Sequence, residues 1–225
     1  MQTARIKKSK KVDRIIHING LIKKKLTLII PLIKEPWKEF TLADIKHISK
    51  NKSHHYVFEA LKEFCSLKIL KEKKSGNTNT YSVNYRDNPN VPLAVLVEVL
   101  IKDERTDVPY NNIEKITEKI KNPFFSLLIT GSYAGKKQTA ISDLDIAIII
   151  PNSESKKEYE IALKEGELMI PEVHGYTFTK DEFYQMLVND EFNYGKEAAR
   201  KHILFCGGEQ YYKILFEAMK HGFKG

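Results

Sequence analysis

FFSLLITGSYAGKKQTAISDLDIAIIIP, residues 124–151, contains two apolar runs separated by a polar connection. The first run covers residues 124–129 and is followed by Gly131-Ser132, and the second covers residues 146–150 and follows Asp143-Leu144-Asp145. Short apolar runs bounded by turn residues are typical of buried strands. The stretch therefore predicts a strand, a turn with a short helix, and a second strand.

The polar residues of this stretch predict a site for a metal ion and a phosphate. Alternate residues of a strand point to the same face, so we expect Asp143 and Asp145 to share one face of the second strand. Two neighbouring carboxylates repel each other, and Mg²⁺, which prefers oxygen ligands, relieves that repulsion. Gly131 would let a phosphate approach the backbone, and Ser132 would face it at a helix N-terminus.

The spacing of these residues resembles that of a known family. Ten residues lie between Gly131-Ser132 and Asp143-Leu144-Asp145, as in the nucleotidyltransferase superfamily of DNA polymerase β and its minimal nucleotidyltransferase branch. The resemblance is tight over residues 124–151, loose to residue 205, and covers nothing before Asn90. It implies an α+β domain with a small mixed sheet and flanking helices. It also implies Mg²⁺-dependent transfer of a nucleoside monophosphate from an NTP, ATP by default, to a hydroxyl of a protein or a nucleic acid. The residues alone leave open a strand pair whose loop carries two solvated aspartates.

A polymerase-β-like site also implies a third carboxylate on the neighbouring strand, which binds metal and accepts the proton of the incoming hydroxyl. Within a third strand expected at residues 169–178, Glu172 is the candidate, and His174 on the same face would assist it. Glu167, near the strand start, is a weaker option. A surface glutamate at a strand start is an equal alternative. The basic residues that could neutralise a triphosphate are Lys136 and Lys137 after the turn, and Lys196, Arg200 or Lys201 on a later helix. Lys136 and Lys137 fit a solvated helix face equally well.

The charge of the chain divides it into two parts. Residues 1–90 carry 20 Lys and Arg against 8 Asp and Glu, whereas residues 91–225 carry 17 against 21. Between them, residues 86–92 read RDNPNVP, a composition typical of a linker. We expect a basic domain at residues 1–88, with a polyanion as its partner, and a nucleotidyltransferase domain at residues 89–225.

The basic part has its own pattern of elements. Apolar residues at helical spacing predict three helices, at residues 22–36, at residues 42–49 after a Thr41 cap, and from Ser53, followed by a hairpin with strands at residues 68–73 and 80–85. This order resembles a winged helix-turn-helix, which implies binding of duplex DNA by the third helix and the hairpin. The expected DNA contacts are Lys52, His54, His55, Tyr56, Lys71, Lys73 and Lys74, with residues 1–11 as a basic arm. A solvated basic face used for dimerisation or partner binding is the alternative.

The rest of the sequence completes an α+β chain. Helices are expected at residues 93–101, 112–121, 154–167, 179–188, 197–205 and 209–219. Cys65 and Cys206 stand alone and no apolar run is long enough to span a bilayer, so we expect a cytoplasmic protein without zinc, disulfides or a membrane partner.

Two other functions stay open: a transcription regulator whose transferase domain only senses nucleotide or binds a partner, and the antitoxin of a toxin–antitoxin pair. A homodimer also stays open.

Overall fold

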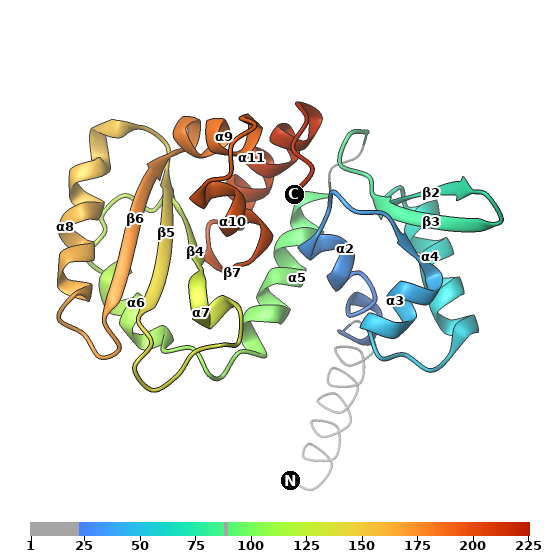
Figure 1. The fold of residues 1–225 in the computed structure, drawn as a ribbon, viewed down its shortest axis with the longest axis horizontal. Helices are drawn as coiled ribbons and strands as arrows, with labels where there is room; N and C mark the ends of the chain where they lie inside the picture. Colours follow the sequence, from blue (N-terminus) through green and yellow to red (C-terminus); the bar gives the residue numbers. More distant parts are fainter. Residues whose placement is uncertain (1–22, 88–89) are drawn as a thin grey trace, which may run out of the picture. The chain divides into compact units, whose positions relative to one another are not determined.

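A computed structural model describes residues 23–87 and 90–225, in which the chain divides into two compact units, Met1–Val83 and Asn84–Gly225 (Figure 1). The expected basic arm, residues 1–11, lies outside the described residues, and so do residues 88–89 of the expected linker. Each unit has its own sheet and its own buried core.

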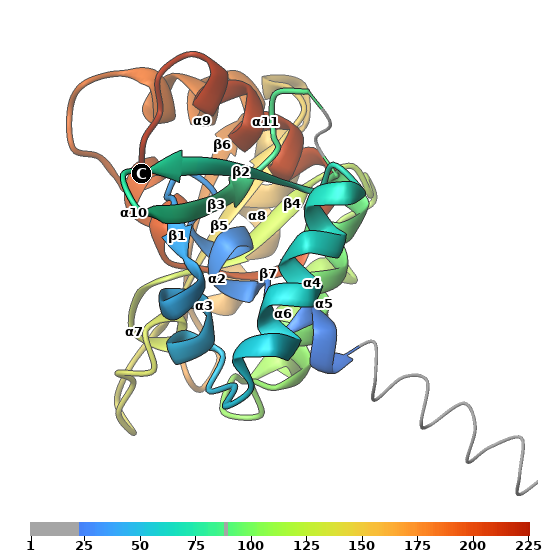
Figure 2. The same ribbon diagram turned by 90° about the vertical axis from the view of Figure 1, so that its right-hand side faces the viewer.

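The first unit consists of short helices and a small antiparallel sheet. Its described elements are α2 (Ile30–Lys34), β1 (Phe40–Thr41), α3 (Leu42–Ile48), α4 (His54–Ser66), β2 (Leu70–Ser75) and β3 (Thr78–Val83). The sheet has the order β1-β3-β2, and Figure 2 shows β2 and β3 as a hairpin. The helices and the hairpin strands close over buried residues such as Leu32, Ile45, Leu61 and Tyr81.

The helix starts of this unit confirm two predicted caps. The Thr41 side chain accepts a hydrogen bond from Asp44 N, and the Asp44 carboxylate accepts one from Thr41 N at 2.8 Å, which forms a capping box. The Ser53 hydroxyl accepts from Tyr56 N at 3.2 Å. The prediction of one continuous first helix was wrong, because residues 27–29 form a turn before α2. Pro31 at the start of α2 has no N–H to continue the helical hydrogen bonds of the preceding turn.

The second unit is built on a four-stranded mixed sheet with the order β6-β5-β4-β7. Strand β4 pairs antiparallel with β5 and β7, and β5 pairs parallel with β6. The helices α6 and α8 share a core with one face of this sheet, and α9 and α11 contact strands of the sheet as well. The elements in chain order are α5 (Val91–Asp103), α6 (Tyr110–Thr117), β4 (Ser126–Ile129), α7 (Gly131–Ala134), β5 (Leu144–Ile150), α8 (Lys156–Gly166), β6 (Val173–Thr179), α9 (Lys180–Val188), α10 (Tyr194–Arg200), β7 (Ile203–Cys206) and α11 (Gly208–Lys220).

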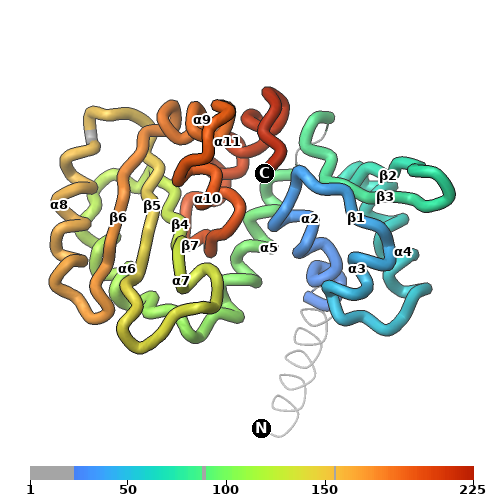
Figure 3. Tube along the Cα trace, in the orientation of Figure 1, coloured from blue at the N-terminus to red at the C-terminus, as the bar shows by residue number. Residues whose placement is uncertain are grey.

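The predicted strand, turn, short helix and strand of residues 124–151 are confirmed as β4, α7 and β5. Figure 3 shows α7 at the end of β4 and the loop that leads from it back to β5. On β5, Leu144 and Ile146 belong to the core shared with α6 and α8. Because side chains alternate along a strand, Asp145 lies on the opposite face, as the sequence predicts.

The expected helix at residues 197–205 was wrong in its second half. The helix α10 ends at Arg200, and Ile203–Cys206 form β7, an edge strand that pairs with β4. These four apolar residues are locally compatible with a helix or a strand. They form a strand because they pair with the otherwise free edge of β4. The third strand also begins later than expected, at Val173, so Glu172 lies one residue before it.

Candidate active site

The turn after β4 is in direct contact with one of the two predicted aspartates. Gly131 has a φ of +59°, and a Cβ placed on it would lie 2.0 Å from the Asp145 Oδ2 atom. Thr130 N also donates a hydrogen bond to the Asp145 carbonyl at 2.9 Å. Only glycine combines this backbone conformation with so close an approach. The sequence therefore brings the predicted phosphate turn and the Asp145 carboxylate together.

The aspartate pair lies where β5 begins. Asp145 is half-buried at the second position of the strand, and Asp143 is exposed immediately before it. Burial raises the pKa of Asp145, and the charges of Asp143 and Glu197 add to that rise while His174 opposes it. A cation at this point would reverse the rise, since it favours the ionised carboxylates.

The metal-binding capacity of this region is limited to few protein ligands. Within residues 23–87 and 90–225, no group of three or more His, Cys, Asp and Glu side chains is placed to hold a metal ion. Mg²⁺ commonly takes one or two carboxylates and completes its shell with water and substrate phosphates. Asp143 and Asp145 could supply these two carboxylates and would hold an ion that arrives with a nucleotide, with the Gly131 backbone directly against the Asp145 carboxylate.

The start of β6 adds two further polar side chains. In the parallel β5–β6 pair, His174 is the register partner of Asp145, and the Glu172 carbonyl accepts a hydrogen bond from Leu144 N at 2.8 Å. The His174 Nε2 and Glu172 Oε1 atoms are 2.7 Å apart. This hydrogen bond raises the pKa of His174, and the charges of Asp143 and Asp145 raise it further. Glu172 is thus next to the aspartate pair, with its carboxylate engaged by His174.

The basic residues expected near the turn are not equivalent. Lys136 and Lys137 follow α7 and are both exposed, and Lys136 adopts a φ of +54°. A Cβ on Gly135 would lie 2.4 Å from Lys201 Nζ, so the Lys201 ammonium rests against the turn. The other two expected residues are engaged elsewhere: Lys196 donates to the Asn189 carbonyl, and Arg200 donates to the Gly225 carbonyl at 2.7 Å.

Aromatic residues next to the turn had no signal in the sequence. The Tyr194 hydroxyl is 2.9 Å from Thr130 Oγ1, and burial raises the pKa of Tyr194 to about 12. The Tyr194 ring packs against Tyr176 and Phe178 of β6, with centroid distances of 5.1 and 5.8 Å. Tyr194 lies far from the turn in the sequence and carries no motif. Only the return of α10 to the sheet places it there.

The predicted DNA contacts of the first unit lie at the start of α4 and along β2. Lys52, His54 and His55 are exposed, whereas Tyr56 is half-buried with the Lys24 ammonium 5.2 Å from its ring centroid. The three hairpin lysines do not share a face. Lys71 and Lys73 point to one side of β2 and Lys74 to the other, because strand residues alternate. Lys73 also forms an ion pair with Glu39 at 3.3 Å.

None of the helices in the described ranges is both long and apolar enough to cross a bilayer.

Comparison with known proteins gives one result, which concerns the second unit. The search of curated proteins returned no match, and neither did the search of solved structures. A family model described as a nucleotidyltransferase domain matches residues 111–198, from α6 to α10, and leaves the first unit outside. This range contains Gly131, Ser132, Asp143, Asp145 and Glu172. Residues 111–198 are therefore similar to nucleotidyltransferase domains, a class of transferase domain that acts on NTP substrates and generally uses divalent metal ions.

Proposed function

We propose that this protein is a Mg²⁺-dependent nucleotidyltransferase that moves a nucleoside monophosphate from an NTP to a hydroxyl of a protein or nucleic acid. The contact between Gly131 and the Asp145 carboxylate carries the proposal. It supports a site in which a phosphate at the turn and a cation at the aspartates are immediate neighbours. The match of residues 111–198 to a nucleotidyltransferase domain supports the same reaction.

The proposed roles follow from the order of the strands. The backbone at Gly131 and Ser132, with the Lys201 ammonium against Gly135, would hold the leaving phosphates on the β4 side of β5. Lys136 and Lys137 would add positive charge from the loop beyond. Mg²⁺ held by Asp143 and Asp145 would neutralise charge that develops on the phosphate oxygens.

The acceptor would approach from the other side of β5. In-line displacement requires the attacking oxygen to lie opposite the leaving pyrophosphate. Since β6 flanks β5 on the side away from β4, Glu172 and His174 would face the attacking hydroxyl. We propose that Glu172 accepts its proton and that the hydrogen bond to His174 orients the carboxylate.

Calorimetry with Mg·ATP and Mg·CTP on the full chain tests the site. The wild type should bind at least one of them only in the presence of Mg²⁺, and Asp145→Asn should abolish this binding. Because burial and repulsion disfavour the Asp145 charge in the folded protein, the substitution should leave the melting temperature unchanged or slightly higher. Equal binding by both proteins would overturn the assignment of the metal and nucleotide site.

A second variant in the same assay separates an enzyme from a nucleotide sensor. Glu172→Gln should bind Mg·NTP nearly as well as the wild type, since the amide still pairs with His174. Transfer of labelled nucleoside monophosphate to protein or nucleic acid should disappear. If neither protein transfers label while both bind nucleotide, the domain is a sensor and the transferase proposal fails.

For the first unit we propose a winged helix-turn-helix that binds duplex DNA, with the domain limits at residues 88 and 89. Three observations support it: the excess of basic residues, the exposed start of α4 after Ser53, and the hairpin β2–β3 that follows this helix. Exposed lysines contribute to DNA affinity through phosphate contacts, which weaken with salt. The test is the salt dependence of duplex DNA binding by the full chain.

A further inference from the structure

We infer that Arg105, Asp107 and Gln138 position the Gly131–Gly135 turn for nucleotide, and we call these three residues the turn clamp. They would act as positioning residues that do not touch the substrate. The inference rests on the proposed function and assigns a role to residues outside the motif that defines the site.

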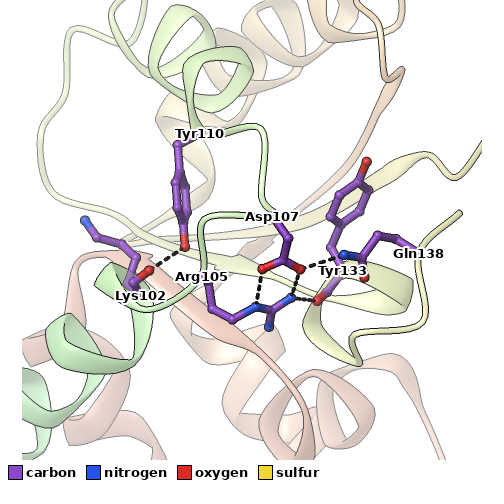
Figure 4. Close-up of polar contacts among 6 residues, drawn as sticks. All are labelled: Lys102, Arg105, Asp107, Tyr110, Tyr133 and Gln138. Carbon is purple, nitrogen blue, oxygen red and sulfur yellow. Dashed lines mark hydrogen bonds and ion pairs between the residues drawn. The ribbon is translucent and has the colours of Figure 1, made fainter. Parts of the chain in front are cut away.

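The turn clamp joins the connection between α5 and α6 to both sides of the loop after β4 (Figure 4). Arg105 donates from Nε and Nη2 to the two Asp107 carboxylate oxygens, at 2.8 Å each. Arg105 Nη2 also donates to the Tyr133 carbonyl, which lies inside the turn. Beyond the turn, Gln138 Nε2 donates to Asp107 Oδ2 at 2.6 Å. The segment from Tyr133 to Gln138 is therefore fixed at both ends by one ion pair.

The Arg105 side chain has little freedom to serve another partner. It is only 6% exposed, whereas that of Asp107 is 38% exposed. The hydrogen bonds from Arg105 hold the pKa of Asp107 well below its usual range, and Gln138 lowers it further. A guanidinium keeps its positive charge in proteins, so the charges of Arg105 and the Asp107 carboxylate cancel. The contribution of the turn clamp to phosphate binding is geometric and does not come from net positive charge.

The point of attachment explains why geometry matters here. The Tyr133 carbonyl also accepts hydrogen bonds from backbone N–H groups at the end of α7, so Arg105 stabilises the carbonyl end of this short helical turn. The opposite end of the turn holds Gly131 against Asp145. A shift at Tyr133 would move the backbone at Gly131 and Ser132 relative to the carboxylate. Misplacement of about 1 Å in a site of this kind costs on the order of 100-fold in rate.

Three substitutions test the inference in the full chain. Asp107→Asn breaks the bidentate ion pair, and we expect about 10-fold weaker Mg·ATP binding, as for the loss of roughly one charge-assisted hydrogen bond that holds the turn. Gln138→Leu removes only the outer hydrogen bond and should weaken binding less. Gln138 Oε1 is buried and accepts no hydrogen bond within residues 23–87 and 90–225, so its loss should cost little stability. This variant keeps the test valid if Asp107→Asn fails to fold.

Tyr110→Phe is the matched control. Tyr110 is the first residue of α6, directly after this connection, and donates from its hydroxyl to the Lys102 carbonyl at 3.0 Å, without reaching the turn (Figure 4). Its removal should leave Mg·ATP binding unchanged while lowering stability as a lost hydrogen bond does. If Tyr110→Phe weakens binding as much as Gln138→Leu, the effect is general destabilisation and the inference is wrong.

Hydrogen exchange of the backbone amides gives a measure that needs no nucleotide. In Asp107→Asn and Gln138→Leu, the amides of residues 131–138 should exchange faster, while those of α8 keep their wild-type rates. Wild-type protein that fails to bind any Mg·NTP would overturn the proposed function and leave this measurement to decide on the turn clamp. Unchanged exchange at residues 131–138 in both variants would overturn the turn clamp itself.

Discussion

The two units present their candidate functional residues in opposite ways. In the second unit, Asp145 is held against the turn by a main-chain hydrogen bond from Thr130 N and by a contact at Gly131 that admits no Cβ. In the first unit, the candidate DNA contacts are exposed side chains at a helix start and along a hairpin. A single substitution in the second unit should therefore be enough to abolish nucleotide binding. In the first unit, each substitution should weaken DNA binding only by the share of positive charge that it removes.

The largest effect is expected from Gly131→Ala, and the first unit supplies its control. Gly76 in the hairpin turn has the same φ of +59° but would have nothing within 4 Å of an added Cβ. Gly76→Ala should therefore cost only the backbone strain, about 1–2 kcal/mol. Gly131→Ala adds the collision with Asp145, so calorimetry should show loss of Mg·NTP binding and thermal unfolding should show the larger destabilisation.

One experimental outcome would contradict the expected difference between the two glycines. If Gly131→Ala and Gly76→Ala lower the melting temperature equally and Mg·NTP still binds, the Asp145 contact does not constrain the turn. The site would then be as tolerant as the surface of the first unit.

The parts of the site that the sequence predicts are those with local signals. Gly131-Ser132 and Asp143-Leu144-Asp145 each mark the junction of an apolar run with a turn, and strand alternation is enough to place Asp145 away from the core. The caps at Thr41 and Ser53 are equally local, since the hydroxyl and the amide that it binds are three residues apart.

The parts that could not be predicted depend on contacts between distant segments. Arg105 reaches the Tyr133 carbonyl and Tyr194 reaches Thr130 only after the sheet has formed. The strand β7 could not be predicted for the same reason, because Ile203–Cys206 become a strand only by pairing with β4. Among Lys196, Arg200 and Lys201, the sequence offers no ground for preferring the one that lies against Gly135.

A smaller effect is expected for the hairpin lysines of the first unit. Lys74 pairs across the hairpin with Asn79, so both lie on the same face, and Asn79 lines a shallow groove together with His54 at the start of α4. Lys71 and Lys73 lie on the other face. Lys74→Gln should therefore lower the slope of log affinity for duplex DNA against log salt by about 0.9, as expected for one phosphate contact.

The double variant Lys71→Gln with Lys73→Gln is the control for the faces of the hairpin. It removes two charges but should leave the slope almost unchanged, because these lysines face away from the start of α4. A larger loss in the double variant than in Lys74→Gln would place the DNA on the other face. No measurable binding by the wild type at low salt would end the DNA proposal.

The smallest effect concerns two helix caps, one in each unit, and tests whether the units fold independently. Thr41 and Thr179 each form a capping box, with Asp44 and Glu182 respectively. Replacement of either threonine by alanine should cost about 1 kcal/mol. Calorimetric unfolding of the full chain should show that Thr41→Ala shifts one transition and Thr179→Ala the other.

The pH dependence of the Thr41 cap sharpens this last test. Hydrogen bonds from Thr41 lower the pKa of Asp44 below its usual value. A carboxylate with a lowered folded pKa stabilises the fold above its unfolded pKa of about 4, and this contribution is lost as the pH falls through the folded pKa. Asp44→Asn should therefore lower the unfolding temperature of the first unit at pH 7, and this effect should disappear in acid. If Thr41→Ala, Thr179→Ala and Asp44→Asn all move a single shared transition, the two units unfold together and act as one domain.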